Sequence, residues 1–361
     1  MRICVYLLRL KNWQVSIMPE QGAIFCIIDG MTDEAFNVQA YPNLAAMKNE
    51  GFFGYFETVP KGFPVESYPC IASLFGIREG DLPLFARGYL EALGKGIQLA
   101  EDDLVLRASW MRLAENGCIL GVAEPPQAVP RFSGLSYHHL GAYRALLVVP
   151  NAKAALKSLK TYPPYAYVGK NLEEILPQGE KRLTQMVRQS LGTEKVLLPW
   201  GQSVSCPFPA FKLKAAAVGA ALIFQGLAKA LGLDVYTKPD FTADTDTALT
   251  AKVELALQLA QVYPLVFLHI NGADEAAHRR DIWEKRFFLE QVDAKVLAPL
   301  QKAGAALLVC GDHGTSPVDG KHIGIPQPFV LYGQKRQGDL GTVQANKAVK
   351  LLLEDELWQR R

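Results

Sequence analysis

Three short apolar segments, each leading to an acidic residue, constrain the fold of this chain more than any other feature. Runs of this length are typical of buried β-strands. In open α/β sheets, ligands bind beyond the carboxyl ends of the parallel strands. The sequence therefore predicts a sheet with three carboxylates at one edge, which indicates a metal centre. Residues 23–28, 264–270 and 307–310 lead to Asp29, Asp274 and Asp312, respectively.

Histidines accompany these carboxylates. His278 is four residues after Asp274, so both would project from one face of a helix, and His313 directly follows Asp312. His322 lies nine residues further on in a glycine-bearing loop. Carboxylate oxygen and imidazole nitrogen together suit zinc, manganese or a similar divalent ion. The other histidines lack such neighbours, and we interpret them as packing or surface residues: His138, His139 and His269.

The length and composition indicate the class of protein. A chain of 361 residues exceeds the usual size of a single core, which predicts two domains. A net charge of +2 gives no reason to expect a nucleic acid or a membrane as partner. Six scattered cysteines without CxxC spacing fit a reducing cytoplasm. The apolar stretch at residues 3–10 is too short to span a bilayer, and we assign no function to residues 1–17.

The middle of the chain has a different sequence pattern from the segments on either side. Within residues 103–210, apolar runs alternate with proline-rich turns, which predicts a smaller inserted α/β domain. Residues 18–102 and 211–361 would then form the metal-binding core. Apolar periodicity predicts helices at residues 214–231, 248–262 (with Thr247 as N-cap) and 281–303.

Ser67 is the candidate nucleophile. A loop containing glycine and proline precedes it, Pro69 follows, and the apolar run after it ends at Gly76. Serine is a favoured N-cap residue, and proline in the first turn of a helix costs no hydrogen bond. We therefore expect Ser67 to cap a helix whose N-terminus favours an anion.

Taken together, these motifs resemble the alkaline-phosphatase superfamily and, within it, the archaeal-type cofactor-independent phosphoglycerate mutases. The resemblance covers essentially residues 24–333. It implies an alkaline-phosphatase-like, mostly parallel sheet flanked by helices, with an inserted smaller α/β cap domain. The segments that carry it are IIDG with Asp29, ES with Ser67, DEAAH with Asp274 and His278, GDHGTSP with Asp312 and His313, and KHIGIPQP with His322.

The resemblance also implies roles for these residues. Two divalent ions, Mn²⁺ in the first place with Mg²⁺, Zn²⁺ or Co²⁺ as alternatives, would activate the Ser67 hydroxyl and stabilise a transferring phosphoryl group. The substrate would be a small phosphorylated metabolite, with Arg144, Lys214 and, less strongly, Arg107 as its cationic contacts. One ion would be held by Asp29, Ser67, Asp312 and His313, and the other by Asp274, His278 and His322.

Two substitutions beside the nucleophile keep other functions open. The family usually has an acidic residue directly after the serine and Asn or His three residues beyond, where this chain has Tyr68 and Ile71. Glycines are also usual at Ala277 and Arg280. The first hypothesis is a phosphoglycerate mutase acting through a phosphoserine. The alternatives are a phosphatase or kinase-like phosphotransferase on another phosphometabolite, and a metal-binding homologue without catalysis.

Overall fold

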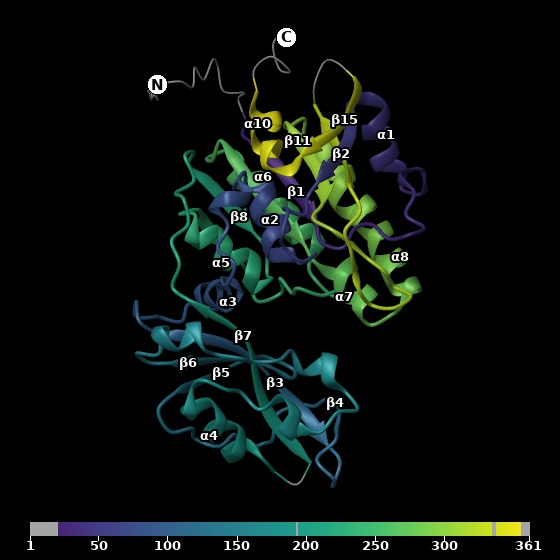
Figure 1. Cartoon of the computed structure of the whole chain (residues 1–361). Helices are drawn as coiled ribbons and strands as arrows, with labels where there is room; N and C mark the ends of the chain where they lie inside the picture. Colours follow the sequence, from purple (N-terminus) through teal and green to yellow (C-terminus); the bar gives the residue numbers. More distant parts are fainter. Residues whose placement is uncertain (1–20, 193, 334–336, 355–361) are drawn as a thin grey trace. The chain divides into compact units, whose positions relative to one another are not determined.

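The computed structural model describes residues 21–192, 194–333 and 337–354, so residues 1–17, to which we assign no function, lie outside the described residues. The chain forms two compact units (Figure 1). The first contains the residues up to Glu79, Phe211–Ala220 and those from Leu233 on, and the second contains Gly80–Ala210 and Ala221–Gly232. The second unit therefore begins before residue 103 and includes a short segment beyond residue 210. Among the described residues, no helix combines the length and apolarity needed to cross a bilayer.

An eight-stranded sheet forms the centre of the first unit. Its strands follow the order β15-β2-β14-β11-β1-β10-β8-β9, and β14 is antiparallel to both of its neighbours while the remaining pairs are parallel. This confirms the predicted mostly parallel sheet. The bounds are Ala23–Ile28 (β1), Phe52–Glu57 (β2), Ala215–Val218 (β8), Asp234–Tyr236 (β9), Leu265–Ile270 (β10), Leu307–Gly311 (β11), Gln327–Tyr332 (β14) and Gly338–Gln344 (β15).

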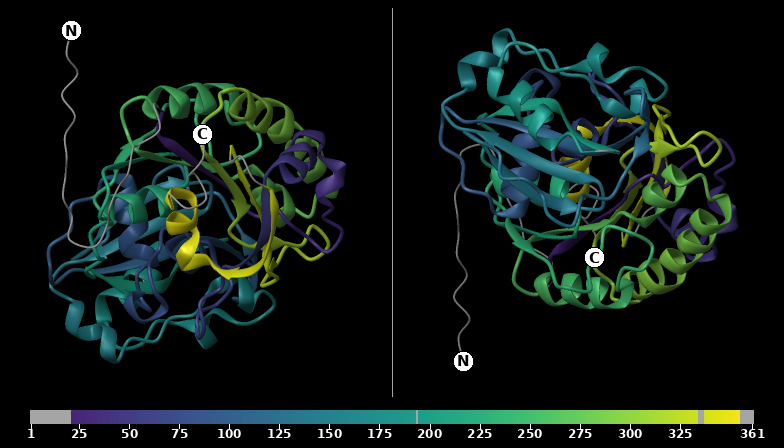
Figure 2. Two further views of the ribbon diagram at one scale, coloured as in Figure 1. Left: turned by 90° about the horizontal axis from the view of Figure 1, so that it is seen from above. Right: turned by 90° about the horizontal axis from the view of Figure 1, so that it is seen from below.

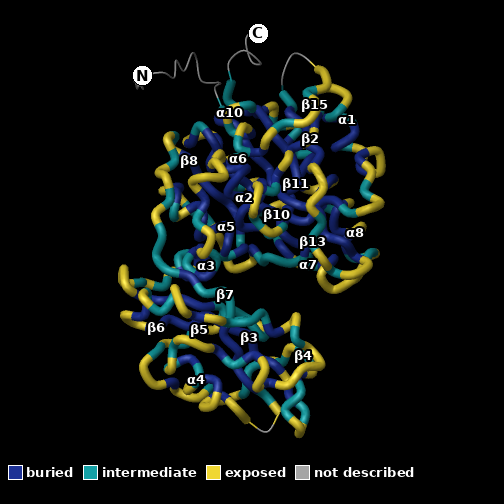
Figure 3. The backbone as a smooth tube through the Cα atoms, in the orientation of Figure 1, coloured by how far each residue is buried: buried dark blue, intermediate teal, exposed yellow. Residues whose placement is uncertain are grey.

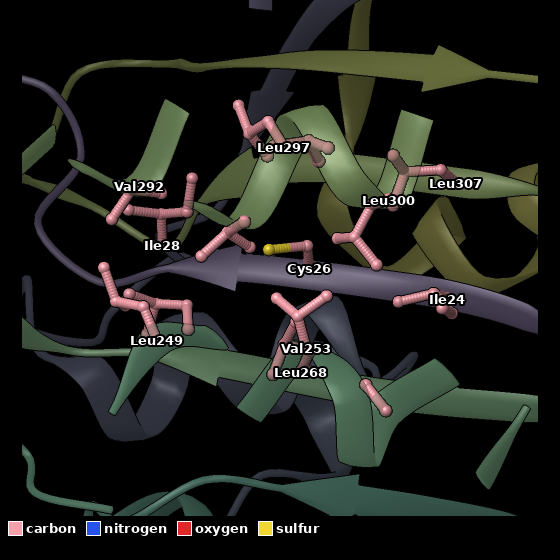
Figure 4. Close-up of a cluster of buried hydrophobic side chains, with 14 of the residues drawn as sticks. Ile24, Cys26, Ile28, Leu249, Val253, Leu268, Val292, Leu297, Leu300 and Leu307 are labelled. Atoms are coloured by element: carbon pink, nitrogen blue, oxygen red, sulfur yellow. The ribbon is translucent and has the colours of Figure 1, made fainter. Parts of the chain in front are cut away.

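Helices cover both faces of this sheet. Ile24, Cys26 and Ile28 of β1 project to one face, where they pack against the helices that follow β9 and β10 (Figure 4). On the other face, the ring of Phe75, just after α2, lies 4.1 Å from that of Phe267 in β10. Figure 2 shows the green helices of the first face and the yellow α10 of the second. The helices are α1 (Pro42–Glu50), α2 (Ser67–Leu74), α6 (Leu249–Leu259), α7 (Gly272–His278), α8 (Ile282–Val292), α9 (Ala298–Lys302) and α10 (Ala348–Leu353).

The structure corrects three helix predictions. The helix predicted at residues 214–231 is wrong in its first part, because the alanines there form β8, followed by α5 (Leu222–Ala230). These alanines are buried between β10 and β9, and pairing on both sides overrides their helical propensity. Ser67 is the first residue of α2 rather than its N-cap, which is Glu66. Likewise α6 has Ala248, not Thr247, at its N-cap.

The predicted helix at residues 281–303 is present but not uniform. The Asp281 side chain accepts hydrogen bonds from the backbone of Trp283 and Glu284 and so begins α8. A π-helical segment, Asp293–Leu297, then joins α8 to α9. A π-turn is wider than an α-turn, so it shifts the buried stripe around the helix axis and keeps it on the sheet.

The second unit contains an antiparallel sheet around the long strand β3, which pairs with β4, β6 and β7. Trp110, Leu147 and Leu183 are fully buried in its core. Two helices, α3 and α5, approach closely at Gly226, where any side chain would collide with the carbonyl of Leu90. The elements are α3 (Arg87–Lys95), β3 (Leu104–Leu113), β4 (Ile119–Val122), β5 (Ser136–Gly141), β6 (Arg144–Val149), α4 (Lys181–Ser190) and β7 (Lys195–Val204).

Candidate metal centre

The three predicted carboxylates lie at the carboxyl ends of neighbouring strands. Asp29 follows β1, Asp312 follows β11, and Asp274 lies in the first turn of α7 just after β10. Strand β1 lies between β11 and β10 in the sheet, and all three run parallel. Figure 3 shows these strands as a buried centre. The sheet therefore brings together side chains separated by more than 200 residues of sequence.

Asp29, Asp312 and His313 form what we call the inner group, whose potential ligand atoms lie within 4.8 Å of one another. His313 Nε2 is 3.5 Å from Asp29 Oδ1 and 3.4 Å from Asp312 Oδ2. The Ser67 hydroxyl lies 3.3 Å from the same nitrogen. Among the described residues, neither Asp29 Oδ1 nor Asp312 Oδ2 has a hydrogen-bond donor, although both atoms are buried. Buried carboxylate oxygens of this kind fit a metal ion.

Asp274, His278 and His322 form the outer group. His278 Nε2 lies 3.2 Å from Asp274 Oδ2, and His322 Nε2 lies 3.5 Å from Asp274 Oδ1. The two Nε2 atoms are 3.0 Å apart. The groups adjoin, because Asp274, His313 and His322 also bring their ligand atoms within 4.8 Å of one another.

The hydrogen bonds of the outer histidines fix which nitrogen faces the site. His278 Nδ1–H donates to the carbonyl of Gly320 at 2.8 Å, and His322 Nδ1–H donates to that of Val65, also at 2.8 Å. In each neutral ring this leaves the Nε2 lone pair directed at Asp274. Two such lone pairs repel each other unless a proton or a cation lies between them. An outer hydrogen bond that orients the ligating nitrogen is the usual arrangement of metal-bound histidine.

Burial and charge affect the three carboxylates differently. Burial raises the pKa of Asp29 well above its usual range, and the charges of Asp312 and Asp274 raise it further. Burial also raises the pKa of Asp312. Burial alone would raise the pKa of Asp274, but hydrogen bonds from the Nε2–H groups of His278 and His322, when these rings are protonated, outweigh it and hold that pKa well below its usual range. A divalent cation would therefore favour ionisation most strongly in the inner group.

Comparison with known proteins places the chain in a family. The family model described as "Metalloenzyme superfamily" matches residues 24–355. The chain belongs to the metalloenzyme superfamily. This membership confirms the resemblance inferred from the sequence motifs and agrees with the presence of divalent metal sites.

Similar proteins carry consistent names. One from Geobacter sulfurreducens, named a probable 2,3-bisphosphoglycerate-independent phosphoglycerate mutase, is 27% identical over 91% of this chain and 95% of its own length. A Metallosphaera sedula protein named as such a mutase is 26% identical over 81% of each chain.

Solved structures agree in fold. A Pyrococcus horikoshii protein, 24% identical, superposes with a TM-score of 0.69 over 94% of this chain and 98% of its own. A cofactor-independent phosphoglycerate mutase from Thermoplasma acidophilum, 20% identical, gives 0.55 over 93% of this chain and 100% of its own. At these identities, the two structures support the metalloenzyme fold.

His269, interpreted from the sequence as a packing or surface residue, lies beside the inner group. It is fully buried in β10, and its Nε2 lies 3.4 Å from Asp29 Oδ2. Burial lowers its pKa to about 3, so the ring is neutral at physiological pH. The available signal was its position one residue before the end of β10, the strand that leads to Asp274. There it pairs with Ile27 of β1, the strand that leads to Asp29.

The three predicted substrate-binding cations are divided between the two units of the chain. Arg107 and Arg144 belong to the second unit and Lys214 to the first. Arg107 Nε lies 3.0 Å from Glu91, and its guanidinium lies 4.3 Å from the ring centroid of Trp200. The other two lie over tyrosine rings, Arg144 over Tyr143 at 5.4 Å and Lys214 over Tyr263 at 5.1 Å. Their contact with a substrate remains a prediction.

Proposed function

We propose that this protein is a metal-dependent phosphotransferase that interconverts 2- and 3-phosphoglycerate without 2,3-bisphosphoglycerate. The observation that carries the proposal is the Ser67 hydroxyl, at the first residue of α2 and 3.3 Å from His313 of the inner group. The names of relatives that are similar over most of the chain support the same substrate. Such an activity would place the protein in cytoplasmic glycolysis.

The proposal assigns two divalent ions, with Mn²⁺ preferred over Mg²⁺, Zn²⁺ or Co²⁺, to the two groups. Asp29, Ser67, Asp312 and His313 would hold one ion. Asp274, His278 and His322 would hold the other. When bound, such ions lower the pKa of a hydroxyl and offset negative charge on phosphoryl oxygens.

Ser67 would carry the phosphoryl group between two positions of the substrate. Its oxygen attacks phosphorus, the new Oγ–P bond forms, and the bond between phosphorus and the substrate oxygen breaks. The glycerate stays bound, and its other hydroxyl then attacks the phosphoserine and restores the serine. The dipole of α2, whose N-terminus lies at Ser67, favours negative phosphoryl oxygens there during both steps.

Cationic side chains would hold the rest of the substrate. We assign this role to Arg144 and Lys214, with Arg107 as a third candidate, because a guanidinium group binds carboxylate and phosphate in a bidentate manner and an ammonium group binds them as a point charge. Residues 103–210 would act as the substrate-binding cap, and residues 18–102 and 211–361 as the metal-binding core.

The test identifies the phosphorylated products that the protein forms. Mn²⁺-loaded protein given 3-phosphoglycerate should form 2-phosphoglycerate, measured by ³¹P NMR, and Ser67→Ala should abolish the reaction. Ser73→Ala is the matched control, because Ser73 lies on the same helix and is 7% exposed, as is Ser67. Full mutase activity in Ser67→Ala would disprove the phosphoserine route.

A phosphatase is the second candidate, and the residues beside Ser67 favour it. Tyr68 is 3% exposed and Ile71 is fully buried, so this helix lacks the polar pair typical of the family next to the nucleophile. Fewer contacts would hold the glycerate while water attacks the phosphoserine. Release of inorganic phosphate without the second isomer would establish this activity. Metal binding without turnover of any phosphometabolite would indicate a non-catalytic homologue.

A further inference from the structure

Lys285 of α8 is a fully buried lysine that the proposed mechanism does not use. Its ammonium group donates hydrogen bonds to the backbone carbonyl of Thr32 at 2.9 Å and to that of Thr315 at 2.7 Å. It also lies 3.3 Å from Asp33 Oδ2. An interior lysine is costly unless it is paired and hydrogen-bonded, so these contacts explain how the charge is tolerated.

The two carbonyls belong to the two loops that carry the inner carboxylates. Thr32 is three residues after Asp29, and Thr315 is three residues after Asp312. The loops also pair directly, because the N–H of Thr315 donates to the carbonyl of Thr32 at 2.9 Å. One lysine therefore contacts both loops at the point where they meet.

The same contact point reaches the outer group. The hydroxyl of Thr315 donates to Asp274 Oδ1 at 2.6 Å. The position of the Thr315 backbone, which Lys285 holds, thus affects a carboxylate of each group. Thr32 is secured in turn, because its hydroxyl donates to the buried side chain of Gln327 at 2.9 Å.

We propose that Lys285 is a positioning residue that holds the Asp29 and Asp312 loops at the separation a divalent ion requires. This role rests on the metal centre of the proposed function. Asp29 and Asp312 repel each other when both are ionised, and that repulsion acts to separate their loops. The ammonium group opposes the separation by bonding to both backbones, so the ligands are arranged before the ion arrives.

A purely electrostatic role for Lys285 predicts the opposite effect on metal binding. A positive charge near three carboxylates repels an incoming cation, so its removal would strengthen metal binding. Loss of a positioning contact weakens binding instead, because the carboxylates must then be ordered at a cost in free energy. The direction of the change in affinity distinguishes the two roles.

The experiment measures Mn²⁺ binding by calorimetry to full-length protein stripped with EDTA. Lys285→Met should weaken binding roughly 10- to 100-fold, as is typical when a group that orients metal ligands is lost. Lys252→Met is the matched control: Lys252 is also fully buried, but its ammonium group donates to the carbonyl of Thr242 at 3.1 Å, outside both loops. The affinity of Lys252→Met for Mn²⁺ should equal that of the parent protein.

Unchanged or tighter binding by Lys285→Met would overturn the proposal. If that variant does not fold, as judged by circular dichroism, Lys285→Gln replaces it, because glutamine keeps an N–H donor for one carbonyl. A weaker affinity of Lys285→Gln supports the proposal, and parent-like affinity contradicts it. A parent protein that binds no Mn²⁺ would overturn the metal centre itself, whereas binding by the parent with no effect at Lys285 overturns only the positioning role.

Discussion

The inner and outer groups of the candidate metal centre use the same kinds of side chain in different surroundings. Asp29, Asp312 and His313 of the inner group are at most 1% exposed. In the outer group, the side chains of His278 and His322 are 38% and 18% exposed. The inner group therefore resembles a closed site within the core, and the outer group is open to exchange with solvent.

The difference shows how neighbouring groups decide the ionisation of a buried carboxylate. In the outer group two histidines stabilise the charge of Asp274 and hold its pKa low. In the inner group burial lowers the pKa of His313. Burial also raises the pKa of Asp29, and the facing carboxylate of Asp312 raises it further. We conclude that the inner group depends on a bound cation for its charge balance more than the outer group does.

The largest effect should come from Asp312→Asn. Removing one of two facing carboxylates takes away a ligand charge, so we expect the stronger Mn²⁺ binding event to disappear in calorimetry. The EDTA-treated variant should be more stable than the parent by about 1 kcal/mol, because the repulsion with Asp29 is gone. Urea unfolding measures this stability, and a metal-free variant less stable than the parent would contradict the comparison.

The second-largest effect should be the pH dependence of the stability of the metal-free protein, in which the inner and outer groups titrate in different pH ranges. The raised pKa of Asp29 contributes stability that is present below about pH 3.9 and is lost as the pH rises through the folded-state pKa. The raised pKa values of His278 and His322 contribute stability that is lost above about pH 6.5. The free energy of unfolding in EDTA should therefore decrease from mildly acidic to neutral pH.

Two controls assign the acidic part of this decrease to the inner group. Asp29→Asn should flatten the acidic part of the curve, measured by urea unfolding at several pH values. Saturating Mn²⁺ should also flatten it, because a bound cation stabilises the ionised carboxylates. A curve with the same slope in the parent and in Asp29→Asn would show that Asp29 is already ionised without metal.

A smaller effect is expected from His278→Gln in the outer group. The side chain is partly exposed, so the stability of the metal-free protein should change by less than about 0.5 kcal/mol. One of two Mn²⁺ binding events should weaken while the other remains, as measured by calorimetry. Loss of both events together would show that the two groups bind metal as a single unit.

The smallest effect on Mn²⁺ binding should come from Asp244→Asn at a nearby ion pair. Asp244 binds Arg279 through two hydrogen bonds of 2.9 and 2.7 Å, so its charge is already balanced by a resident cation. Because both partners are about 40% exposed, stability should fall by no more than about 1 kcal/mol. Mn²⁺ affinity should not change, and a clear loss would mean that this pair orients the neighbouring His278.

Individual residues show how far the sequence could predict the structure. The strands before Asp29, Asp274 and Asp312 were predictable because an apolar run must be buried and a carboxylate at its end must reach solvent or a ligand. The alanines of β8 misled the prediction, because local propensity favours a helix and only their pairing with two strands decides otherwise. Lys285 gave no signal, because its partners Thr32 and Thr315 are remote in sequence.

The type of fold, the candidate carboxylates and histidines, and the resemblance that the family comparison confirmed could all be inferred from the sequence alone. These depend on local patterns of burial and on motifs a few residues long. Three features depend on the tertiary structure alone. Histidines stabilise the carboxylate of Asp274, the carboxylate of Asp29 faces another carboxylate, and the buried Lys285 contacts both loops. The reason is physical: the charge state of a buried group depends on distances to atoms that chain folding, and not sequence proximity, brings together.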